Sequence, residues 1–88
     1  MPVILQSTAF ATETVTTTTG TSGNIQLSQA VRNGTFITAH TVGTPSAILL
    51  PFRDRNGAIY LKALHWDTTT LDIYASTELT YTVVYKPA

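Results

Sequence analysis

The segment AILLPFRDRNGAIYLKALHW, residues 47–66, predicts the fold of this 88-residue chain. Two apolar arms flank a polar stretch at residues 53–57. Within that stretch, Asn56-Gly57 is a strong signal for a two-residue hairpin turn, because both central residues of a type I′ turn need positive φ. The second arm alternates between two faces, one with Ile59, Leu61 and Ala63 and the other with Tyr60, Lys62 and Leu64. The segment therefore predicts a long antiparallel hairpin in an all-β protein.

Further short strands are predicted on both sides of the hairpin. Apolar alternation and β-branched residues predict them over residues 3–10, 13–19, 25–27, 35–42, 71–74 and 79–85. Pro51 interrupts the first hairpin arm, which predicts an edge strand or a bulge there. Seven or eight short strands with regular turn signals are typical of a small antiparallel β-sandwich or jelly roll. We predict that fold, as a single domain spanning residues 1–88.

Residues 28–34 allow two interpretations. Ser28 could cap one helical turn over residues 29–32, with Asn33-Gly34 ending it as a C-cap. Alternatively, Asn33-Gly34 forms a tight turn that leads directly into the strand over residues 35–42. The tight turn is the preferred interpretation, so no helix is expected.

Composition restricts the function more than any motif does. The chain has five basic and five acidic residues, and charged residues make up 11% of it, against about 25% in ordinary soluble domains. There is no basic stripe of the kind that binds nucleic acid, no cysteine, and no apolar run of the roughly 18 residues needed for membrane insertion. Eighteen residues are threonine, which keeps strand surfaces polar without charge. A neutral surface of this kind predicts a protein that packs against copies of itself or within a larger assembly.

The chemistry-bearing residues do not form a catalytic or metal-binding pattern. His65 and Asp67 would project to the same face of a strand, which is the geometry of a histidine–carboxylate pair or of two metal ligands. A third ligand would have to come from His40 or Asp72, at no diagnostic spacing. A hydrogen-bonded histidine beside a solvated aspartate is the preferred interpretation. We predict no catalytic residues, no metal site, no cofactor and no enzymatic activity.

Two groups of residues are candidates for binding. Tyr60, Trp66 and Asp67 could form an aromatic platform for a carbohydrate, because a ring stacks on the apolar face of a sugar and a carboxylate accepts from its hydroxyls. Arg53, Asp54 and Arg55 gather three of the ten charges at the hairpin tip and could form a contact loop. Core packing of the aromatic residues and a solvated turn are the respective alternatives.

The second half of the chain supports a family resemblance. The stretch NGAIYLKALHWDTTTLDIYASTELTYTVVYKPA, residues 56–88, resembles the terminal β-domains of tailed-bacteriophage structural proteins, in which a hairpin, an aromatic-rich strand and a final T-x-T-V-x-Y strand close a small sandwich. The resemblance implies a virion component, often trimeric: a fibre head, a receptor-binding tip or a capsid decoration protein. It transfers no binding residue. The short chain fits a decoration or adaptor role better than a fibre tip.

The expected function is therefore that of a non-enzymatic structural protein located in the virion. It would decorate or cement a capsid, or form part of a fibre, by assembling into a homo-oligomer, with a trimer favoured, and by contacting other virion proteins. The alternative is a carbohydrate- or receptor-binding module of a phage tail tip or a bacterial surface protein, with a host surface glycan as its partner.

Overall fold

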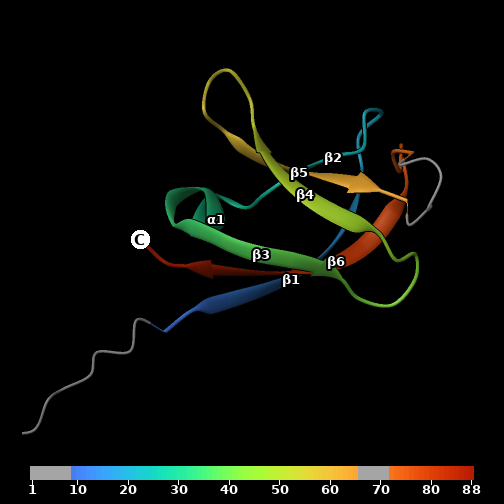
Figure 1. The fold of residues 1–88 in the computed structure, drawn as a ribbon. Coiled ribbons are helices and arrows are strands. Elements are labelled where there is room, and N and C mark those ends of the chain that lie inside the picture. The colour runs from blue at the N-terminus through green and yellow to red at the C-terminus, as the bar shows by residue number, and fades with distance from the viewer. Residues whose placement is uncertain (1–8, 66–71) are drawn as a thin grey trace, which may run out of the picture.

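A computed structural model describes residues 9–65 and 72–88 of the chain (Figure 1). These residues form six strands and one short helix: β1 Ala11–Thr18, β2 Asn24–Gln26, α1 Gln29–Asn33, β3 Thr35–Thr41, β4 Ile48–Arg53, β5 Ile59–Leu64 and β6 Glu78–Lys86. The strands make two three-stranded antiparallel sheets, sheet A with the order β1-β6-β3 and sheet B with the order β2-β5-β4. The predicted all-β class is confirmed, while the sandwich or jelly-roll topology stays a prediction.

The predicted hairpin is formed by β4 and β5, which pair in register from Ile48 opposite Leu64 to Arg53 opposite Ile59. Its first arm lies at the edge of sheet B, as the proline in it predicts. Alternation along β5 buries Leu61 and Ala63 completely. The local pattern therefore predicted both arms and the shared face of Leu61 and Ala63, whereas Leu64, which it assigned to the opposite face, is also buried, at 7% exposure.

The type of hairpin turn differs from the prediction. The N–H of Gly57 donates to the carbonyl oxygen of Asp54, and the N–H of Asp54 donates to the carbonyl oxygen of Ala58, both at 3.0 Å. Gly57 has φ +84°, whereas Asn56 is not in the positive-φ region. This is a type I turn followed by a left-handed glycine in a three-residue loop. The cause is the Asp54 carboxylate, which accepts from the N–H groups of Asn56 (2.8 Å) and Ala58 (3.0 Å) and so holds the loop in this form.

The preferred tight turn at residues 28–34 is wrong, because the chain forms the helix α1 there. Ser28 caps it and accepts from the N–H of Val31 at 3.4 Å, while the N–H of Gly34 donates to the carbonyl oxygens at the helix end. Val31 is 1% exposed, so this helical turn buries an apolar side chain in the core. Gly34 also lies directly against the carbonyl oxygen of Lys86, where a Cβ atom would collide.

Sheet A is organised by β6, its central strand. β6 pairs with β1 from Ala11 opposite Tyr85 to Thr18 opposite Glu78 without a break in register. On its other side it pairs with β3, where the register shifts between residues 36 and 38. The predicted strand over residues 13–19 thus corresponds to β1.

One apolar core joins the two sheets, which lie as two layers in Figure 1. The largest completely buried side chains come from β5, β6, α1 and the segment between β2 and α1. The buried members of the core are Ile25, Leu27, Val31, Ala47, Leu49, Leu61, Ala63, Leu79, Tyr81, Val83 and Tyr85. Alternate residues of β6 contribute four of them, as its sequence pattern predicts.

Two predicted strands differ from the structure. Of residues 3–10, only 9 and 10 are among the described residues, and these two lie outside any strand. Of residues 71–74, residue 71 lies outside the described residues, and Ile73 forms only an isolated bridge with Leu64. The bridge is antiparallel: the backbone N–H of Tyr74 donates to the carbonyl oxygen of Ala63 at 2.9 Å, so residues 72–74 run alongside the end of β5 over this single bridge. The described residues therefore hold six strands instead of seven or eight.

Candidate functional site

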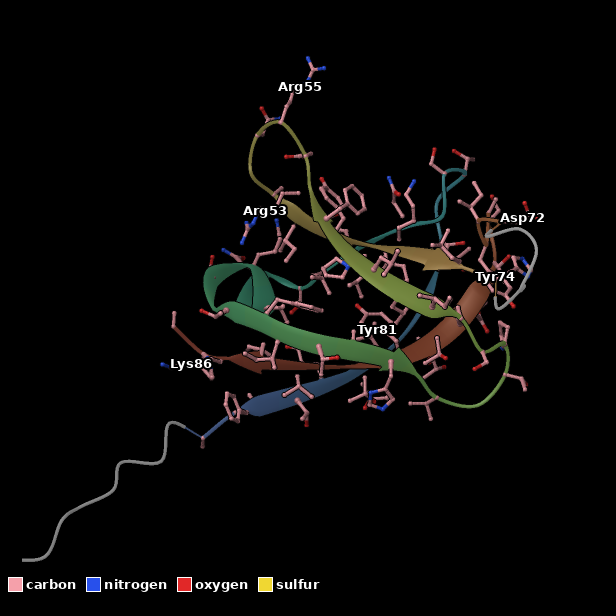
Figure 2. The ribbon with its side chains drawn as sticks, viewed as in Figure 1. Arg53, Arg55, Asp72, Tyr74, Tyr81 and Lys86 are labelled. Atoms are coloured by element: carbon pink, nitrogen blue, oxygen red, sulfur yellow. The ribbon has the colours of Figure 1, made fainter. Side chains whose placement is uncertain are left out.

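The predicted contact loop lies at the tip of the β4–β5 hairpin, which projects from the rest of the molecule (Figure 2). Only part of it is available for contact. Asp54 accepts the two backbone N–H groups described above, and Arg53 donates from Nη1 to the carbonyl oxygen of Gly57 at 2.8 Å. Arg55 extends away from the protein at the end of the loop. Two of the three residues therefore hold the turn, and Arg55 is the one whose side chain extends into solvent.

Of the three residues of the predicted aromatic platform, only Tyr60 is among the described residues. Tyr60 lies on the outer side of sheet B, opposite Phe52 of β4, and the two rings stack with centroids 5.5 Å apart and planes at 22°. The ammonium group of Lys62 lies 5.7 Å from the centroid of the Phe52 ring. Trp66 and Asp67 lie outside the described residues. The sequence did not predict the Phe52–Tyr60 stack, because it depends on the register between the two hairpin arms.

His65 has a different neighbour from the one that the sequence suggested. Its ring stacks on the Tyr74 ring, with centroids 3.6 Å apart and planes at 11°. The backbone N–H of His65 donates to the backbone carbonyl oxygen of Asp72 at 2.7 Å. The Tyr74 hydroxyl in turn donates to the carbonyl oxygen of Ser46 at 3.2 Å. His40 lies on β3 in the other sheet. Among residues 9–65 and 72–88, no three His, Asp or Glu side chains are grouped to hold a metal ion.

The outer face of sheet A is an ordered array of threonines that no sequence motif pointed to. Register places alternate residues of β1 opposite alternate residues of β6. Two cross-strand pairs share hydroxyl hydrogen bonds, Thr14 with Thr82 at 2.9 Å and Thr16 with Thr80 at 2.8 Å. The alternating threonines of residues 12–18 were a signal for it, but the pairing with a strand more than 60 residues away was not visible.

Glu13 is the one charged residue of β1, and it lies half-buried on the inner side of this strand. Ser28, the cap of α1, donates from its hydroxyl to Oε1 of Glu13 at 2.7 Å. Tyr81 of β6 is 1% exposed. Burial raises the pKa of the Tyr81 hydroxyl, and the negative charge of Glu13 raises it further. This arrangement links β1, β6 and the start of α1.

The surface formed by the described residues has no pocket. No helix in this part of the chain has the length and apolar character needed to cross a membrane. Comparisons of the chain with models of protein families, with curated proteins and with solved structures gave no match.

Proposed function

We propose that the chain is a non-enzymatic structural protein that acts by packing against copies of itself and against other subunits of a larger particle. The observation that carries this proposal is the uncharged outer face of sheet A. Glu78 and Lys86 lie at the two ends of β6. Between them, this face is formed by alternate residues of the three strands: Thr80, Thr82 and Val84 of β6, the even-numbered threonines of β1, and Thr38 and His40 of β3. Such a face has no like charges to repel a second subunit and few charges to desolvate on contact.

Exposed apolar side chains support the same function. Ile37 and Val42, in and just after β3, and Leu50 on β4 are each 46–47% exposed. The two strands contact each other across the sheets, and each is an edge strand. Exposed apolar side chains that lie near one another are a recurrent feature of surfaces that contact other proteins.

The virion as the setting rests on the resemblance of residues 56–88 to phage structural domains. The test is to follow the protein through gradient purification of virus particles from its source, with antibodies raised against the recombinant chain. We expect it to migrate with intact particles and to stay attached at about 1 M salt, where charge–charge attraction is screened within about 3 Å. Absence from purified particles would contradict the virion role, and release by salt would contradict an interface of low charge.

Carbohydrate recognition is the second candidate function, and the Phe52–Tyr60 stack favours it. The stack presents aromatic rings on the outer side of sheet B beside the Lys62 ammonium group, a combination suited to the apolar face and hydroxyls of a sugar. A glycan array is the test. Binding that is lost in Tyr60→Ala or Trp66→Ala, with the circular dichroism spectrum unchanged, would support this function, and an array without signals above background would contradict it.

A further inference from the structure

We infer that the open edge of β1 is where two copies of the chain pair, antiparallel and about a two-fold axis, so that two A sheets become one six-stranded sheet. The inference rests on the proposed assembly function and names the interface. Three features of the β1 edge support it: its regular shape, the direction of its backbone N–H and C=O groups, and its self-complementary sequence.

β1 is the least protected of the four sheet edges. It keeps a continuous register with β6 over eight residues, and β6 is its only strand partner within the described part of the chain. The other three edges each carry a feature that discourages pairing. β3 has a register shift, β4 contains Pro51, and β2 is only three residues long. A long, regular edge without lysine or proline is a template for another strand.

The ladder geometry shows which backbone groups point away from the sheet. Beyond the end of β1, the N–H of Thr19 donates to the carbonyl oxygen of Thr77 at 2.9 Å, so this opposed pair is a hydrogen-bonded one. On the other side of β6, the N–H of Val42 donates to the carbonyl oxygen of Thr80. Because hydrogen-bonded and non-hydrogen-bonded pairs alternate, odd-numbered residues of β1 bond to β6. The N–H and C=O groups of the even-numbered residues, all threonines, therefore face the open edge.

The sequence of β1 is self-complementary in the antiparallel register that is centred on Val15. If Val15 lies on the two-fold axis, Thr14 faces Thr16 of the second copy, and residue 12 faces residue 18. This register pairs the even-numbered residues with one another, which is what their outward backbone groups require. It also places Glu13 opposite Thr17, so the single charge of the strand does not meet its own copy. A register centred on Glu13 would oppose two carboxylates and is disfavoured.

The side chains at this edge are already ordered for pairing. The hydroxyl bonds of Thr14 with Thr82 and of Thr16 with Thr80 hold the outer-face side chains of β1 in place before a partner arrives. Less side-chain entropy is therefore lost on association. Cross-strand threonine pairs are favourable, so the second copy extends the same array. A two-fold interface closes on itself and yields dimers, which differs from the trimer expected from the sequence.

The experiment compares two lysine pairs introduced on opposite edges of the same face. The test variant is Thr14→Lys/Thr16→Lys on β1. The matched control is Thr38→Lys/His40→Lys, two exposed residues at the same spacing on β3. The mass of the full chain is measured by light scattering and sedimentation over micromolar to millimolar concentrations, and circular dichroism verifies the fold of each variant.

We expect two chain masses for the unmodified chain and for the control, and one chain mass for the β1 variant. The register also predicts rescue. Mixing the lysine variant with Thr14→Glu/Thr16→Glu should restore two chain masses, because residue 14 of one copy then opposes the opposite charge at residue 16 of the other. Neither variant should dimerise alone.

Several results in solution would overturn the inference. They are a monomer at every concentration, equal loss of the dimer in the β3 control, and a β1 lysine variant that associates like the unmodified chain. A stable trimer would also overturn the two-fold interface while leaving the assembly function intact. Failure of the particle-fractionation test with a dimer in solution would instead remove the virion role and keep the interface.

Discussion

The β4–β5 hairpin and sheet A differ in how far apart in the chain their paired residues lie. In the hairpin, Arg53 lies opposite Ile59 and a short loop closes the pair. In sheet A, Thr14 bonds to a threonine 68 residues away. Closing the hairpin costs little chain entropy, whereas sheet A must recover the entropy of a long loop from its buried contacts. The stability of sheet A should therefore depend mainly on its core residues, and the stability of the hairpin mainly on its turn.

The largest loss of stability is expected from a substitution at the centre of sheet A. Tyr81→Ala removes a completely buried ring from β6, and we expect it to lower the free energy of unfolding by about 3–5 kcal/mol. For a chain of this size, that is a large part of a total of about 4–13 kcal/mol. Urea denaturation measures the effect. Thr82→Ala, one position along on the outer face, is the control and should cost about 1 kcal/mol or less; equal losses would contradict this account of the core.

Substitutions of two glycines, one beside sheet A and one in the hairpin loop, should have the next largest effects on stability. Gly34→Ala places a methyl group against the carbonyl oxygen of Lys86, backbone that cannot move without disturbing the end of β6. We expect a loss of about 1–3 kcal/mol in thermal unfolding. At the hairpin, Gly57→Ala meets open space but forces a side chain onto φ +84°, at about 1–2 kcal/mol. A neutral Gly34→Ala would show that the junction between α1 and β6 is loosely packed.

A smaller effect is expected at the hairpin loop. Asp54→Ala removes the acceptor for two backbone N–H groups and should cost about 1 kcal/mol, measured as the shift of the urea midpoint. Asp54→Asn keeps an oxygen in the same place and should recover most of the loss. If the two variants were equally destabilised, the carboxylate charge rather than its acceptor geometry would hold the turn.

The smallest expected effect is a dependence of the free energy of unfolding on pH, which arises from Tyr81 in sheet A. Burial and the charge of Glu13 raise the pKa of Tyr81 above its usual 10.0, so the folded state keeps this proton more tightly than the unfolded state does. Its contribution is complete below pH 10 and is lost as the pH rises through the higher folded-state pKa. Unfolding measured by urea from pH 9 upwards should show a shallower decline for Tyr81→Phe than for the unmodified chain. Glu13→Gln should reduce the decline in part, and an unchanged slope in Tyr81→Phe would contradict the assignment.

The candidate sites show what local sequence can and cannot predict. Residues 53–55 form the exposed tip that the sequence predicts, because a hairpin turn with charges projects into solvent wherever the arms go. The threonine face of sheet A was visible only as composition. The threonines form one continuous face only because residues 12–18 pair with β6, and no local sequence pattern predicts that pairing. The Phe52–Tyr60 stack was missed for a related reason, since it needs the exact register of the hairpin arms.

The sequence by itself determined the all-β class, the hairpin and the inward face of β6. Each of these follows from alternation of apolar residues over a few positions and from a turn signal. Only the tertiary structure decided that residues 29–33 are helical, because the burial of Val31 and the contact between Gly34 and Lys86 join parts of the chain far apart in sequence. It also decided which strand lies at the open edge of sheet A. Short-range patterns specify which residues face inward, but the choice of neighbouring strands depends on how all the buried faces fit together.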